Sequence, residues 1–146
     1  MAIVGVILSI TAFAQDLKEV DGIYYNQSGP YSGTYRTYYD NGRTEVIMKL
    51  KDGKKHGKIK LFFDSGQLNE IRSYKNNRMH GRWVIYNKDN IKVSEARYKK
   101  GKKHGTWRIW NDEGDLLYVL HYNNGEKCGT WKRFDEAGRL VNERTY

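Results

Sequence analysis

The chain has 146 residues, which is long enough for one domain. Only 38% of the residues are hydrophobic and the mean hydropathy is −0.85, so a large buried core is not expected. Its formal net charge of +9 favours anionic partners over basic ones. A single cysteine, Cys128, excludes an internal disulfide framework and a cysteine zinc site, and fifteen glycines with one proline predict many tight turns.

The first fourteen residues, MAIVGVILSITAFA, carry no charge. Their apolar run of about ten residues is too short to cross a bilayer, which takes roughly 20. It ends in Ala12-Phe13-Ala14, the small-x-small pattern that signal peptidase cleaves, although no basic residue precedes the apolar run. We therefore predict a secretory signal over 1–14 and an exported protein (periplasmic, on the outer surface or secreted); a buried N-terminal strand is the alternative. Residues 15–32 form a lead-in segment.

From residue 33 onward the chain repeats one unit of 24 residues. A glycine opens each unit, and a tryptophan or a smaller apolar or aromatic residue stands two places later. Seventeen places after the glycine stand Leu50 and then four tyrosines. The positions that we expect to hold the repeat together are Gly33, Gly57, Gly81, Gly105, Gly129, Tyr74, Tyr98 and Tyr122. Because such recurrence marks a repeat architecture, we expect five units, at 33–56, 57–80, 81–104, 105–128 and 129–146.

Each unit reads as a β-hairpin. An aromatic, β-favouring run follows the glycine, then a polar turn such as Asp40-Asn41-Gly42, then a second extended run. Glycine and Asx residues interrupt every run that could form a helix. Because a single hairpin is marginal in water, the units must stack on one another. The prediction is an all-β fold: an elongated, single-layer antiparallel meander of about five stacked hairpins.

The pattern G-x-W-x-x-Y…G-x-L…Y-x-x-G, as in GTWRIWNDEGDLLYVLHYNNG, resembles the MORN repeat in its bacterial variant, over residues 33–146. The departures are Tyr35 and Ile59 in the tryptophan place, Asn90 in the turn-glycine place, and Cys128 in the histidine place. The resemblance implies the same single-layer sheet. Bacterial members are often labelled antitoxin or immunity components, and eukaryotic arrays are regarded as scaffolds and membrane-associated modules.

The recurring histidines His56, His80 and His104 invite a metal or catalytic interpretation. Equivalent positions in successive hairpins lie two strands apart, roughly 10 Å, whereas zinc holds nitrogen ligands at about 2.0–2.1 Å. No carboxylate or nucleophile recurs beside them. We therefore expect a capping or packing role, no catalytic, metal or cofactor site, and no enzyme activity. Cys128 stands in the same repeat position, with Lys127 and Lys132 nearby, and a reactive thiol is the alternative reading.

Charge is distributed unevenly between the two kinds of turn. The linkers 51–56, 75–80, 99–104 and 123–128 hold ten Lys or Arg and two acids, whereas the hairpin turns 39–42, 63–66, 87–90, 111–114 and 135–138 hold seven acids and one Lys. A meander places these turns on opposite edges, so we expect a basic edge and an acidic edge. The basic ridge would comprise Lys54, Lys55, Lys75, Arg78, Lys99, Lys100, Lys102 and Lys103. Turn chemistry and solubility also account for this distribution.

Trp83, Trp107 and Trp131 complete the candidate binding surface, because one face of a single-layer sheet can stay partly open. Stacking of the hairpins is the competing role for these rings. We predict a non-catalytic exported repeat protein that binds an unidentified protein, of which a toxin or an envelope protein would be examples. The alternative is binding of a polyanion or of the envelope surface, such as anionic lipid or polysaccharide, through the basic edge. Export argues against a nucleic-acid partner, and the sequence leaves the oligomeric state open.

Overall fold

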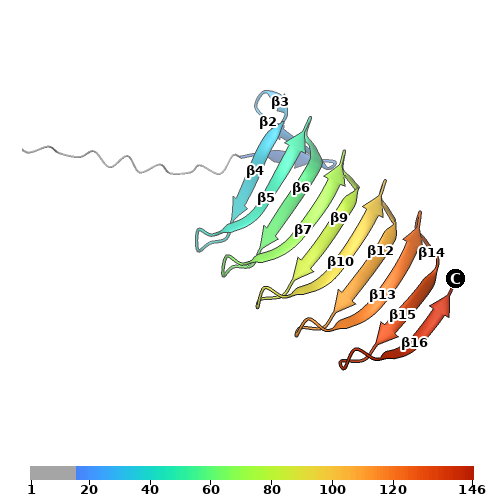
Figure 1. Ribbon diagram of the computed structural model, residues 1–146. Helices are drawn as coiled ribbons and strands as arrows, with labels where there is room; N and C mark the ends of the chain where they lie inside the picture. The colour runs from blue at the N-terminus through green and yellow to red at the C-terminus, as the bar shows by residue number, and fades with distance from the viewer. Residues whose placement is uncertain (1–15) are drawn as a thin grey trace, which may run out of the picture.

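The computed structural model describes residues 16–146, in which all regular secondary structure is β-strand. The strands are β1 (Lys18–Val20), β2 (Ile23–Asn26), β3 (Gly29–Pro30), β4 (Gly33–Tyr38), β5 (Thr44–Lys51), β6 (Lys54–Phe62), β7 (Leu68–Lys75), β8 (Arg78–Met79), β9 (Gly81–Tyr86), β10 (Lys92–Lys99), β11 (Lys102–Lys103), β12 (Gly105–Trp110), β13 (Leu116–Asn123), β14 (Glu126–Lys127), β15 (Thr130–Phe134) and β16 (Leu140–Thr145). Figure 1 shows them as successive antiparallel hairpins.

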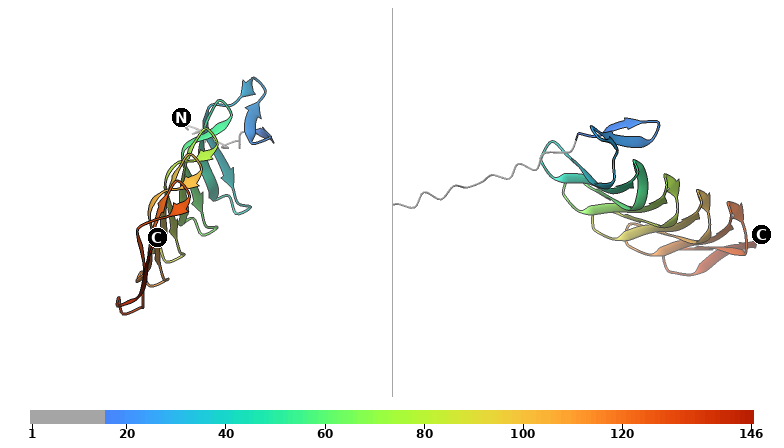
Figure 2. Two further views of the ribbon diagram at one scale, coloured as in Figure 1. Left: turned by 90° about the vertical axis from the view of Figure 1, so that its right-hand side faces the viewer. Right: turned by 90° about the horizontal axis from the view of Figure 1, so that it is seen from above.

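The long strands form one antiparallel meander in the order β16-β15-β13-β12-β10-β9-β7-β6-β5-β4, and the short strands β8, β11 and β14 pair with the preceding β7, β10 and β13. The sheet is a single curved layer, as the two further views in Figure 2 show. This arrangement confirms the predicted all-β meander of stacked hairpins. A separate small sheet, β1-β2-β3, is built from the lead-in segment.

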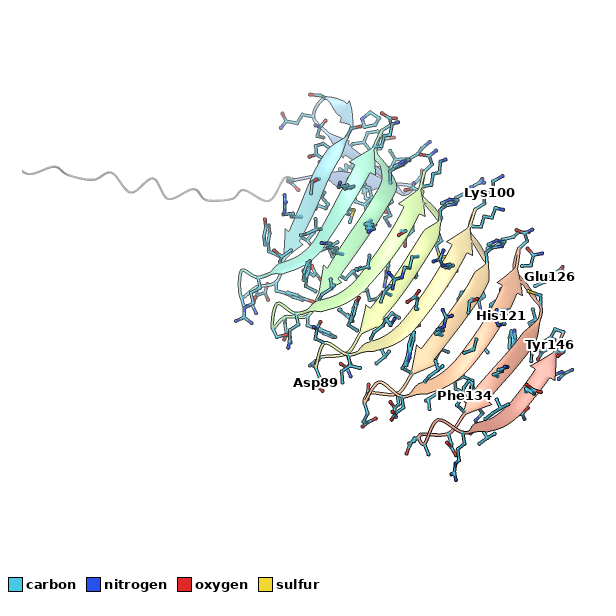
Figure 3. The ribbon with its side chains drawn as sticks, in the orientation of Figure 1. Asp89, Lys100, His121, Glu126, Phe134 and Tyr146 are labelled. Carbon is cyan, nitrogen blue, oxygen red and sulfur yellow. The ribbon has the colours of Figure 1, made fainter. Side chains whose placement is uncertain are left out.

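The two sets of turns lie on opposite edges of the sheet. In Figure 3, Asp89 marks the edge of the wider hairpin turns and Lys100 marks the edge of the linkers. The linker turns have two central residues with positive φ, as at Asp52 (φ 50°) and Gly53 (φ 71°) or at Lys100 (φ 51°) and Gly101 (φ 85°). Two such residues define the type I′ turn, whose twist matches that of the strands it joins.

Each linker turn is hydrogen-bonded to the linker of the preceding unit. The backbone N–H of Gly53 donates to the carbonyl of Tyr31 at 2.8 Å, and Gly101 N–H donates to Met79 O at 2.8 Å. The same 22-residue offset joins Asn77 to Lys55 and Gly125 to Lys103. The linkers therefore form a continuous hydrogen-bonded row along one edge of the array.

The recurring glycine is needed because a side chain of the preceding hairpin lies over it. At Gly81, with φ 96°, a Cβ would lie 3.3 Å from the Cβ of Ser73. At Gly105, with φ 73°, it would lie 3.5 Å from the Cδ of Arg97. Both the left-handed backbone and the close approach favour glycine at the start of each unit.

Residues of the lead-in segment help to build the main core. Tyr24, Met48, Leu50 and Ile59 are buried together, and Leu17, Tyr31, Tyr35, Val46, Leu61 and Tyr74 pack against them. Tyr24 N–H donates to Gly53 O at 2.9 Å, and the side-chain amide of Asn77 donates to Gly22 O at 2.9 Å. The lead-in is thus an integral layer over the first two units.

The signal peptide expected over 1–14 lies outside the described residues. Within the described range, no helical segment has the length and hydropathy that crossing a bilayer requires.

Asn90 provides a test of the hairpin turns. It stands where the other units have glycine, with φ 62°, and its N–H donates to Asn87 O at 3.0 Å. Because alanine tolerates this left-handed conformation less well than asparagine, we expect Asn90→Ala to lower the free energy of unfolding by about 1 kcal/mol. Asn90→Gly should leave it unchanged or raise it. Urea unfolding followed by circular dichroism measures both, with Lys88→Ala as the control. Equal stability of the alanine and glycine variants would show that the left-handed conformation at residue 90 does not limit stability.

Candidate interaction surfaces

The strand register divides the side chains of the sheet between two faces. Trp107 pairs with Leu120 and Gly105 with Tyr122, so these alternate residues share one side, which we call the ladder face. The intervening pairs, such as Arg108 with Val119, point to the opposite side, which we call the outer face.

Aromatic rings form an unbroken ladder on the ladder face. From Tyr74 to Tyr146, tyrosine and tryptophan alternate, one ring from each strand. Successive centroids lie between 4.9 Å, for Trp83 and Tyr98, and 5.7 Å, for Tyr74 and Trp83. All the ring pairs are tilted, an arrangement worth about 0.5–1.5 kcal/mol per pair beyond the area it buries. Leu50 and Ile59 interrupt the ladder in the first two units, and the ring of Tyr24 lies 6.1 Å from Tyr35 there.

The tryptophans of the ladder also make a specific hydrogen bond. Trp107 Nε1–H donates to Arg97 O at 3.0 Å, and the backbone N–H of His104 donates to the same carbonyl at 2.9 Å. Trp83 and Trp131 repeat this bond to Ser73 O and His121 O. Each tryptophan thus supplies a second donor to the carbonyl just before the chain enters the linker, which explains why an indole recurs at this position.

The residue before the repeat glycine caps the next linker turn in three units. His80 Nδ1 accepts from the backbone N–H of Lys100, and His104 Nδ1 accepts from Asn124 N–H, both at 3.4 Å. In the first unit, Ser32 Oγ accepts from Asp52 N–H at 2.7 Å, whereas His56 Nδ1 lies 3.1 Å from Asn76 Oδ1. His80 and His104 thus have the capping role expected from the repeat, and His56 contacts the side chain of the same turn residue. Cys128 is partly buried, and its N–H donates to His121 O at 3.0 Å.

The expected basic ridge divides between the two faces. Lys103 Nζ lies 4.8 Å from the centroid of Trp107 and 5.0 Å from that of Tyr122, so it covers the ladder. Lys55 lies near Tyr24 and Tyr74 in the same way. The other members of the ridge do not cover the ladder: Lys100 stands in a linker turn, and the register places Lys54, Lys75, Arg78, Lys99 and Lys102 on the outer face.

Two concavities lie near these surfaces. One, of about 490 Å³, is lined by the cations Lys54, Lys75, Arg78 and Lys100 together with Asn76 and His80. The other, of about 210 Å³, lies on the ladder face of the last two units; we call it the ladder groove. It is lined by Tyr118, Leu120, Trp131, Lys132, Arg133, Asn142, Arg144 and Tyr146. The cations of the linkers indicated the first concavity from the sequence. The ladder groove depends on the strand register, so the sequence did not predict it.

Ionisable groups on the two faces are perturbed by their neighbours. A hydrogen bond from Arg82 Nη2 at 2.8 Å, assisted by Lys92, lowers the pKa of Glu95 on the outer face. On the ladder face, the Glu70 carboxylate at 2.6 Å raises the pKa of Arg72. Burial raises the pKa of the Tyr98 hydroxyl in the ladder. The described residues contain no group of three or more His, Cys, Asp or Glu side chains that could hold a metal ion.

This architecture is that of a stacked-hairpin repeat protein that offers extended surfaces in place of an enclosed cleft. Residues 55–76, 103–124 and 127–146 match the model of the MORN repeat variant, and each match begins two residues before a recurring glycine. These three stretches are MORN-type repeats, which confirms the resemblance seen in the sequence. This family is generally a non-catalytic repeat module that suggests a binding role. No curated protein matches the chain.

The indole hydrogen bond can be tested with Trp107→Phe. Phenylalanine keeps a ring in the ladder but removes the N–H that reaches Arg97 O, so we expect a loss of about 1 kcal/mol beyond the effect of the smaller ring. Trp110→Phe is the matched control, because within the described residues the Trp110 indole makes no hydrogen bond. Chemical unfolding monitored by circular dichroism compares the two. A larger loss in the control would show that ring size, and not the N–H, matters.

Proposed function

We propose that this protein is a protein-interaction module that binds a partner polypeptide through the ladder face of its last two units. The observation that carries the proposal is a contact within the chain itself. Over the first two units this face is already covered by a polypeptide, the small sheet β1–β3, whose Tyr24 is buried against Met48 and Ile59. In Figures 1 and 2 the described part of the chain places no second segment of this kind over the later units.

The ladder groove is the repeat equivalent of that covered region. Residues three units apart differ by 72 in number, so Val46, Met48, Ile59 and Leu61 correspond to Tyr118, Leu120, Trp131 and Arg133. The first four belong to the region that the small sheet covers, and the second four line the groove.

The groove differs from its covered counterpart in ways that describe its partner. The large rings of Tyr122 and Trp131 replace Leu50 and Ile59, so a partner would lie on the ladder and not insert a ring as Tyr24 does. Arg133 and Arg144 add positive charge to the lining. The chemistry that fits is an extended segment with an apolar side chain next to carboxylates.

An antitoxin or immunity role is one version of this function, and it rests on the family resemblance alone. A toxin would then be the partner, and the product of an adjacent gene is the first candidate. We propose that such a product causes growth arrest when expressed alone and that co-expression of this protein relieves it.

Partner binding is testable with two matched double variants. Tyr118→Ala with Arg133→Glu alters a cross-strand pair on the ladder face, and Val119→Ala with Arg108→Glu alters a cross-strand pair on the outer face that does not line the groove. Each variant truncates one side chain to alanine and removes two units of positive charge. In pull-downs with co-expressed products of adjacent genes, we expect the first variant to weaken the complex by about 10–100-fold, as for interface hot spots.

The outer-face variant should bind like the unaltered protein. Equal losses in the two variants, with both folded by circular dichroism, would count against the ladder face as the binding site. Failure of every adjacent product to bind would count against the antitoxin version.

We also propose that the protein is exported. The support is the uncharged apolar start and the Ala12-Phe13-Ala14 pattern. N-terminal sequencing of the protein from periplasm or medium should begin at Gln15. Recovery of the chain from the cytosol with its first residues intact would contradict export.

A further inference from the structure

Like charges stand directly opposite one another at three consecutive linkers. The register pairs Lys51 with Lys54, Lys75 with Arg78, and Lys99 with Lys102 across the type I′ turns, all on the outer face. We call these six residues the paired-cation row. All six are exposed, and within the described range none of them is in an ion pair. At the fourth linker the equivalent pair is Asn123 with Glu126.

This arrangement is unfavourable for folding. Side chains directly opposite in an antiparallel pair have Cβ atoms about 4.5–5.5 Å apart, and like charges at that position destabilise the hairpin. A fourth such pair, Arg82 with Arg97, continues on the same face, and there Arg82 is compensated by Glu95 at 2.8 Å. Solubility requires surface charge, but it does not require cations to face one another in pairs. A bound anion would remove the repulsion.

The row is also a continuous surface. The concavity lined by Lys54, Lys75, Arg78 and Lys100 joins the first, second and third linkers and contains no acidic side chain. Successive linkers are two strands apart, so the pairs recur at about 10 Å along the array. A linear ligand lying across the strands would meet one cation pair at each step.

We propose that the paired-cation row binds a linear anionic polysaccharide, on the face opposite the proposed protein-binding ladder. This activity goes beyond the proposed protein binding, because it uses different residues. Five of the six cations are lysines, which act as hydrated point charges and not as bidentate forks, so the row recognises charge density more than one oxyanion geometry.

The side chains also distinguish between polyanions. Binding of single-stranded nucleic acid normally adds aromatic rings on which bases stack, but none of the six row residues is aromatic, and the stacked rings of the ladder lie on the other face. The row contains no apolar side chain to enter a membrane interface. A polymer that offers only repeated carboxylate or sulfate groups fits this surface better than either.

Adjacent lysines that point to opposite faces allow a matched experiment. Lys54→Gln with Lys102→Gln removes two charges from the row, and Lys55→Gln with Lys103→Gln removes two charges from the ladder face. Binding to heparin, a sulfated polysaccharide, is measured by titration over a range of salt concentrations. The row variant should bind about tenfold more weakly in 0.1 M salt, with a salt slope shallower by about 2. The ladder variant should bind like the unaltered protein.

A third variant separates binding from folding. Arg78→Glu turns the Lys75 pair from like to opposite charge, so its melting temperature should be unchanged or higher while its affinity for heparin falls. Equal losses in the row and ladder variants, or no heparin binding by the unaltered protein, would overturn the proposal. Tighter binding to an oligothymidylate or to phosphatidylglycerol vesicles than to heparin would overturn the choice of ligand. None of these results depends on whether the ladder groove binds a protein.

Discussion

The contact between aromatic rings of adjacent strands is the interaction on which this fold depends. A single-layer sheet has no second layer to bury its side chains against, and only a few residues of this one, such as Val84 and Ala96, are buried away from the N-terminal sheet. The ladder compensates by packing each ring against the rings of both neighbouring strands at about 5 Å. The indole hydrogen bond joins the same rings to the backbone just before the chain enters the linker.

Because the contacts that stack the hairpins lie on the ladder face, the residues of the outer face can vary from unit to unit. The ladder face repeats its aromatic rings from Tyr74 onward, whereas the outer face has cation pairs at three linkers and Asn123 with Glu126 at the fourth. The two faces consequently differ in chemistry as well as in position. A protein partner and a polyanion could occupy them at the same time, because a ligand on one face does not cover the other.

The 24-residue period made the fold predictable, because glycine, turn residues and aromatics recur at places where a hairpin needs them. The role of Tyr24 was not predictable, because the lead-in lies outside the repeat and its ring occupies space left by Leu50 and Ile59. The division of the basic ridge between two faces was also not predictable. Lys54 and Lys55 are neighbours in sequence, but β-strand geometry continues through the linker and sends them to opposite faces. Prediction of the ladder groove would have required the strand order and the register, which the repeat period alone does not supply.

The hydrogen bonds between linker turns have a consequence for how such a gene can change. Beyond the contacts with the lead-in, each turn is joined to the linkers of the adjacent units, so no unit depends on the total number of units. Duplication or loss of 24 codons would lengthen or shorten the array without displacing the remaining hairpins. Natural selection could therefore adjust the number of cation pairs, and with it the avidity for a polymer, in whole steps and without redesigning any single binding site.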